Sequence, residues 1–162
     1  MLHRLIFLAV VAMLFPACSR SLPKYEKPIA KTQFQRVRTT AYTHTESDHL
    51  AHGRKTAIGT ELQAGPISSA AADWSRWPVG TVFRICDTGE VCRVDDIGWA
   101  LSGRNTIDLY KPSRLAMNKW GLRNVEIEIL EWGSLEESLR ILKPRARHRH
   151  VQRMIEGIED QI

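Results

Sequence analysis

The most informative run of this chain is VDDIGWALSG (residues 94–103), and IDLY (residues 107–110) follows it closely. These two runs place Asp96 and Asp108 in short strand-like segments beside glycines, where a backbone bends and a ligand can approach closely. A carboxylate among apolar strand residues is costly to bury unless it is paired or used chemically, and Asp108 stands between two aliphatic residues. The pattern indicates a functional site on a sheet.

Short strand-like runs continue on both sides of this segment. Their β-branched and alternating residues are separated by Gly, Pro and Asp, and closely spaced short strands favour a small β-barrel. The expected strands are residues 36–43, 60–62, 80–86, 91–94, 106–109 and 125–130. The chain is therefore predicted to be mainly β, with no internal repeat.

Helix signals occur in the last third of the chain. Residues 112–120 begin near a proline and stop at Gly121, which is the usual asymmetry of a short helix. The side chains expected to pack on the barrel are Leu115, Ala116 and Trp120. A capping-box pattern at Ser134 opens a further helix that ends before Pro144, and residues 151–162 are expected to form another.

The first 35 residues predict export. In residues 1–18, a basic residue precedes an apolar stretch that is shorter than the roughly 20 residues of a membrane span, as in a signal peptide. Cys18 lies in a lipobox-like segment and is expected to be lipidated, with ordinary cleavage after Ser19 as the alternative. Both routes lead to the cell envelope, either to the periplasm or to an outer-membrane anchor. Residues 19–35, which contain prolines and lysines, are interpreted as an extended tether.

The charge distribution argues against a nucleic-acid partner. The chain carries a formal charge of +5, but residues 36–133 hold 12 basic and 12 acidic residues, so the excess lies in the tails. In the C-terminal extension, residues 134–162, a block at residues 140–153 has six basic residues and no acid. Such a block either attracts anionic lipids and wall polymers or is a solvated tail.

Two cysteines flank an expected turn at residues 87–90. Strands on either side of this turn would bring Cys86 and Cys92 close together, and a disulfide is then expected in an oxidising compartment. Two unpaired thiols are the alternative, because a hairpin fixes proximity but not disulfide geometry.

Several segments, in order, resemble the 3D domain, a family named for three aspartates. They are TAYT (40–43), TAIGT (56–60), AADW (71–74), WPVGT (77–81), DIG (96–98), Gly103, IDLY (107–110) and WGLRNV (120–125). The resemblance spans about residues 38–131 and implies a six-stranded double-psi β-barrel over residues 36–133. The same fold occurs in the catalytic part of membrane-bound lytic transglycosylase A and is related to rare lipoprotein A and the expansins.

The resemblance carries the three aspartates over to Asp73, Asp96 and Asp108. It implies that Asp108 is the catalytic residue, with Asp96 beside it. A lytic transglycosylase cleaves peptidoglycan between MurNAc and GlcNAc, and the sugar's own C6 hydroxyl attacks to give 1,6-anhydroMurNAc. One carboxyl is then both acid and base, and desolvation is expected to raise the pKa of Asp108. Asp73 has the alternative role of capping backbone amides, and Asp95 is expected to face solvent.

Further residues are expected to bind the glycan. They are Tyr42, Thr60, Gly98, Trp99 and Gly103. The interval from Asp96 to Asp108 is one residue longer than in the family pattern, and Trp99 stands where a small residue is usual. A tryptophan there stacks on a sugar ring, narrows the groove or packs as core.

Two other functions remain open. A polar loop holds possible zinc ligands at His44, Glu46, Asp48, His49 and His52, which would suit a metal-dependent wall hydrolase. A barrel of this kind could also bind peptidoglycan without cutting it, as an envelope lipoprotein. The expected partners are peptidoglycan strands and, through the lipid anchor, a membrane. The protein is expected to be a monomer without a cofactor or a bound metal.

Overall fold

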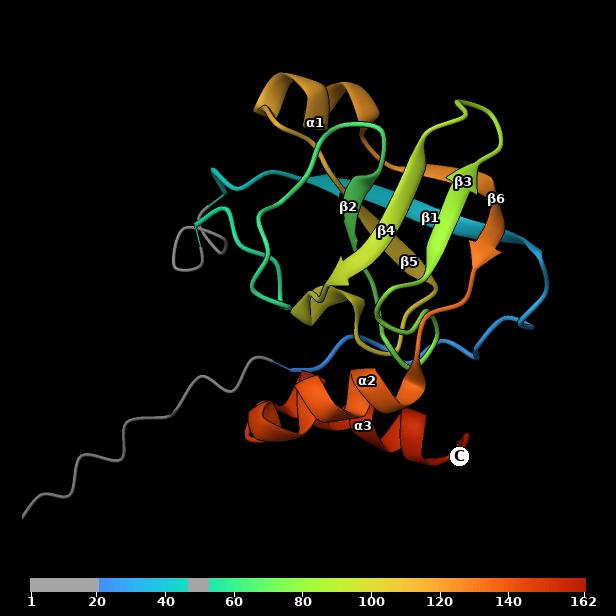
Figure 1. Cartoon of the computed structure of the whole chain (residues 1–162), viewed down its shortest axis with the longest axis vertical. Coiled ribbons are helices and arrows are strands. Elements are labelled where there is room, and N and C mark those ends of the chain that lie inside the picture. The colour runs from blue at the N-terminus through green and yellow to red at the C-terminus, as the bar shows by residue number, and fades with distance from the viewer. Residues whose placement is uncertain (1–20, 47–52) are drawn as a thin grey trace, which may run out of the picture.

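The computed structural model describes residues 21–46 and 53–162, so the expected signal peptide and Cys18 lie outside the described residues. Six strands close into a barrel in the order β1-β5-β2-β4-β3-β6 (Figure 1). The strands are β1 (Phe34–Tyr42), β2 (Ser68–Ala71), β3 (Val82–Ile85), β4 (Val91–Asp96), β5 (Thr106–Tyr110) and β6 (Arg123–Glu131). The expected mainly β barrel is confirmed.

The barrel is mixed. β1 pairs with β5 and β2 pairs with β4 in parallel, whereas the other neighbouring strands are antiparallel. This closed arrangement of six strands is compatible with a double-psi barrel. Its interior is filled by alternate residues along the strands, because side chains of a strand alternate between the two faces of the sheet. Residues that are fully buried there include Phe83, Ile85, Val94, Ile107, Leu109 and Ile127.

Strand β2 was not among the expected strands. Its residues are small and all four are buried, so the segment has neither β-branched side chains nor alternation to mark it. The strand expected at residues 60–62 is instead one bridge between Lys55 and Glu61. The position of β2 between β4 and β5 is thus set by its pairing with both strands.

Helix α1 (Arg114–Trp120) lies at one end of the barrel (Figure 1). The Ser113 hydroxyl accepts a hydrogen bond from the Ala116 N–H and caps the helix. Trp120 is buried as expected, but Leu115 is 81% exposed, which corrects the expected packing. Leu115 and Trp120 are five positions apart, and at 100° per residue they lie about 140° apart around the helix.

The C-terminal extension covers the other end of the barrel (Figure 1). It consists of α2 (Leu135–Leu142), a 3₁₀ turn η2 (Lys143–Arg145) and α3 (Arg149–Glu159). Apolar side chains of both helices join the main core. They include Leu139, Leu142, Val151, Met154 and Ile158. The extension is therefore a packed layer of the fold, and its basic block lies mostly on the outer surface rather than in a solvated tail.

Residues 21–33, called the N-terminal strap here, run along the barrel without forming a helix or strand. The Glu26 N–H donates to the Gly103 carbonyl, and the Glu26 carboxylate pairs with Arg38 at 2.9 Å and Arg104 at 3.3 Å. Arg153 of α3 donates to the Pro23 carbonyl. The segment expected to be a tether is thus docked. Its contacts are largely polar, so the strap shows no hydrophobic periodicity in the sequence.

Cys86 and Cys92 are free thiols, which corrects the expected disulfide. In the antiparallel pair β3/β4, Cys92 lies opposite Phe83 and faces the core, whereas Cys86 lies beyond the strand and is exposed. Side chains alternate between the two faces of a sheet, which separates the two sulfurs. Burial raises the pKa of Cys92 to about 12.

No helix in the described ranges is both long and apolar enough to cross a bilayer.

Candidate active site

Asp96 and Asp108 are brought to one face of the barrel by β2. Ala71 pairs with Asp96 of β4 on one side and with Asp108 of β5 on the other. Two strand spacings place the two aspartate Cα atoms about 10 Å apart. Thr40 of β1 continues the row, because it pairs with Asp108. Directly paired residues share a face, so the row forms one surface.

Asp108 is the more accessible of the two. Its neighbours Ile107 and Leu109 are fully buried, whereas Asp108 itself is partly exposed on the opposite face of the strand. The Thr40 hydroxyl donates a hydrogen bond of 2.7 Å to Asp108 Oδ1. This contact orients the carboxyl group and leaves it within reach of solvent.

Asp96 is 6% exposed, and both of its carboxylate oxygens accept hydrogen bonds. Oδ1 accepts from the backbone N–H groups of Ala57 and Ile97, each at 2.9 Å. Oδ2 accepts from the Tyr42 hydroxyl at 2.9 Å. Asp96 therefore ties the loop around residue 57 to the end of β4.

Tyr42 lies within the electrostatic field of both aspartates. Burial, followed by the charge of Asp96 and more weakly that of Asp108, raises the pKa of Tyr42 well above its ordinary value. The hydroxyl thus stays protonated at neutral pH and remains a donor to Asp96. The Tyr42 ring meets Tyr110 edge-on at 5.7 Å between ring centroids, and the Tyr110 hydroxyl lies 2.8 Å from His44 Nδ1. These rings form an aromatic wall beside the aspartates.

Asp73 has a different environment. Its side chain is 1% exposed, and Oδ1 accepts hydrogen bonds from the N–H and hydroxyl of Ser75 at 2.8 and 2.7 Å. Oδ2 accepts from the Gly103 N–H at 2.5 Å and lies 3.9 Å from the Arg76 guanidinium. These contacts match the alternative of backbone capping. Asp73 thereby fixes the loop that joins Asp96 to Asp108.

Asp95 is buried rather than facing solvent, which corrects the expectation. The pairing of β2 with β4 shifts register between Ala70 and Ala71, so Asp95 is the extra residue of a bulge and the usual alternation fails. Its Oδ2 accepts a hydrogen bond of 2.7 Å from Ser69, whereas its buried Oδ1 has no hydrogen-bond partner. Desolvation raises the pKa of Asp95 to about 6.

Of the other residues expected to bind glycan, some lie near Asp96 and one lies elsewhere. Gly98 and Trp99 directly follow Asp96 and Ile97, and Trp99 is half-buried at the start of a 3₁₀ turn, η1 (Trp99–Leu101). Thr60 is exposed on the loop that Asp96 anchors, and its hydroxyl is 2.9 Å from that of Thr56. Gly103 is buried with φ +75°, and a Cβ there would lie 3.0 Å from both Arg153 and Tyr25. Gly103 therefore packs under the strap rather than at the aspartate row.

The expected metal loop is described only in part, because Asp48, His49 and His52 lie outside the described residues. His44 contacts Tyr110, and Glu46 accepts a hydrogen bond of 3.2 Å from the Thr43 N–H. Across residues 21–46 and 53–162, no three His, Cys, Asp or Glu side chains are grouped to hold a metal ion.

Two contributors to the site were not among the predicted site residues, although both lie in segments of the family resemblance, TAYT (40–43) and TAIGT (56–60). Ala57 acts through its backbone N–H, to which any residue except proline would be equivalent, and Thr40 acts through its register with Asp108. A search against protein-family models finds no match for this chain, and a search of curated proteins finds no significant relative.

Proposed function

We propose that this protein is a lytic transglycosylase-like enzyme of the 3D-domain type, which cleaves peptidoglycan glycan strands between MurNAc and GlcNAc. The observation that carries the proposal is the row formed by Asp96, Ala71 and Asp108 across neighbouring strands, with one aspartate buried and the other accessible. The order of sequence motifs that resembles the 3D domain supports the same assignment.

The accessibility of the two aspartates favours transglycosylation over hydrolysis. A glycosidase of the usual kind needs two working carboxyl groups, one as acid and one as nucleophile or base. Both oxygens of Asp96 accept hydrogen bonds from protein donors, so Asp96 suits support better than attack on a sugar. Of the two aspartates, Asp108 is the more accessible and is the one that would meet a substrate. One carboxyl is sufficient when the nucleophile belongs to the sugar itself.

In the proposed reaction, protonated Asp108 gives its proton to the glycosidic oxygen, and the bond from that oxygen to C1 of MurNAc breaks. The GlcNAc residue leaves with a free 4-hydroxyl. The C6 hydroxyl of the same MurNAc attacks C1, forms the 1,6-anhydro ring and returns a proton to Asp108. The Asp96 carboxylate would favour positive charge on the ring, and Thr40 keeps the Asp108 carboxyl oriented.

Product analysis tests this proposal. Purified sacculi are incubated with the protein and with Asp108→Asn, and 1,6-anhydromuropeptides are measured by mass spectrometry. We expect the substitution to reduce their formation by about 10²-fold or more, as loss of an acid–base group usually does. Asp87→Asn, which changes an exposed aspartate in the β3–β4 turn, is the matched control and should keep full activity.

Binding without cleavage is the second candidate, because only one carboxyl group of the pair Asp96 and Asp108 is accessible. A lack of anhydro products from the unsubstituted protein, with sacculus pull-down retained, would overturn the enzyme and support the binding module. Loss of activity or thermal stability with a chelator would instead favour the metal-dependent hydrolase. In each case we propose an exported envelope protein, with Cys18 as its lipid attachment site.

A further inference from the structure

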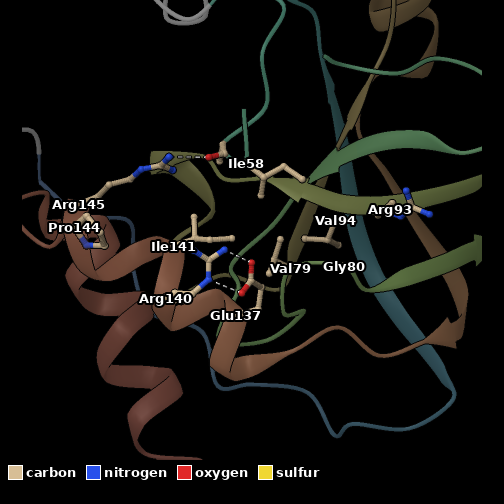
Figure 2. A pocket seen from close by; sticks show the side chains of 11 residues that line it. Ile58, Val79, Gly80, Arg93, Val94, Glu137, Arg140, Ile141, Pro144 and Arg145 are labelled. Carbon is tan, nitrogen blue, oxygen red and sulfur yellow. Dashed lines mark hydrogen bonds and ion pairs between the residues drawn. The ribbon is translucent and has the colours of Figure 1, made fainter. Parts of the chain in front are cut away.

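A hollow of about 620 Å³ lies between the barrel and the C-terminal helices (Figure 2). This volume falls within the range of roughly 300–1,000 Å³ that is typical of ligand sites. The barrel contributes the loop at residues 57–58, the turn at residues 79–80 and part of β4, and the other wall is formed by α2 and η2. The apolar lining residues are Ala57, Ile58, Val79, Val94, Ile141 and Pro144.

The charged residues of the hollow are mainly basic. They are Arg93, Arg140 and Arg145, against the single acid Glu137. Glu137 and Arg140 neutralise each other, since the two Glu137 oxygens accept hydrogen bonds from the Arg140 guanidinium at 2.7 and 2.5 Å. Arg93 and Arg145 therefore carry the excess charge of the lining. Arg145 donates to the Ala57 carbonyl at 2.8 Å, and this bond occupies one of its five N–H donors. The rim therefore has a net positive charge and free guanidinium donors above an apolar floor.

One residue joins this hollow to the candidate active site. Ala57 donates its N–H to Asp96 Oδ1, and its carbonyl accepts the hydrogen bond from Arg145. Figure 2 shows the Arg145 side chain extending from η2 to the loop at residues 57–58, with Ile58 and Ile141 nearby. The hollow therefore adjoins the loop that Asp96 anchors.

We infer that the hollow binds the acidic peptide arms of a glycan strand held at the aspartates. This inference rests on the proposed function. Peptidoglycan peptides carry several carboxylates and short apolar side chains, which match guanidinium donors at the rim and an aliphatic floor. The C-terminal helices thereby give the barrel a preference for glycan that still carries peptide.

Direct titration tests the inference without requiring catalysis. A soluble stem tetrapeptide is titrated into the full protein by NMR, with Arg140→Gln, Arg145→Gln and Arg145→Lys as variants. We expect the Kd to rise about tenfold in each Gln variant and to recover partly in Arg145→Lys, which keeps the charge. Arg147→Gln removes the same charge from an exposed residue that does not line the hollow, and it should bind as the unsubstituted protein does.

Two results would overturn the inference. One is no measurable peptide binding, and the other is an equal loss in Arg147→Gln, which would indicate general surface charge that also attracts anionic vesicles. Peptide-free glycan separates this inference from the proposed function. If no glycan is bound or cleaved but the peptide still binds through Arg140 and Arg145, the proposed function fails and the peptide site stands.

Discussion

The burial of Asp95 predicts how the stability of the folded protein changes with pH. Its pKa is raised from the ordinary 3.8 to about 6, chiefly by desolvation. The folded protein thus holds this proton more tightly than the unfolded chain. The contribution of Asp95 to stability is fully present below about pH 4 and is lost as the pH rises through 6. A shift of about two pKa units corresponds to about 3 kcal/mol of destabilisation at pH 7.5.

Asp95→Asn removes this charge but keeps an oxygen for the Ser69 hydroxyl. We expect the variant to be about 2–3 kcal/mol more stable than the original protein at pH 7.5 and about equal to it at pH 4. Urea unfolding at the two pH values measures the difference. Asp87→Asn is again the control and should change stability by less than about 0.5 kcal/mol at both. An equal gain at both pH values, or none at pH 7.5, would contradict a buried charge at Asp95 as the cause of the instability.

Three further predictions concern packing, the site and the thiols. Ile158→Ala should lower the free energy of unfolding in urea by about 2–5 kcal/mol, because the side chain is fully buried. Ile162→Ala changes a 71% exposed residue and should lower it little. Similar losses in the two variants would contradict a packed C-terminal layer. Tyr42→Phe removes the hydrogen-bond donor to the buried Asp96 carboxylate and should lower the free energy of unfolding by about 1–3 kcal/mol. The proposed glycan-cleaving activity should fall as well. Unchanged stability would count against that hydrogen bond. A thiol reagent should label Cys86 in the native protein and Cys92 only after unfolding, as mapped by mass spectrometry. If neither cysteine is labelled before reduction, a disulfide joins them, which would contradict the free thiols.

The barrel was predictable where side chains carry a periodic signal. The alternating β-branched residues of β1 and β6 and the stop of α1 at Gly121 follow local rules that the fold obeys. Strand β2 was not predicted, because its four small buried residues show no alternation of polar and apolar side chains. Leu115 was misplaced because a seven-residue helix can bury only one narrow face.

The candidate site was predictable in its residue types but not in their surroundings. Asp96 and Asp108 stood out as carboxylates in apolar strands, yet the burial of Asp95 depends on a bulge that a single sequence does not mark. The contacts of Ala57 with Asp96 and Arg145 are made by its backbone, so its side chain carries no trace of them. Long-range backbone contacts of this kind require the tertiary structure.

Docking of the N-terminal strap changes how far the barrel could travel from a membrane. The 18 residue-to-residue steps from Cys18 to Arg36 would allow a reach of up to about 65 Å if the whole segment were free. The Arg153 bond to the Pro23 carbonyl and the Glu26 ion pairs instead fix the chain to the barrel from residue 23 onward. Five steps then remain, with a reach of at most about 18 Å. A lipid at Cys18 would hold the barrel close against the bilayer, so only glycan strands that lie near the membrane would be within its range.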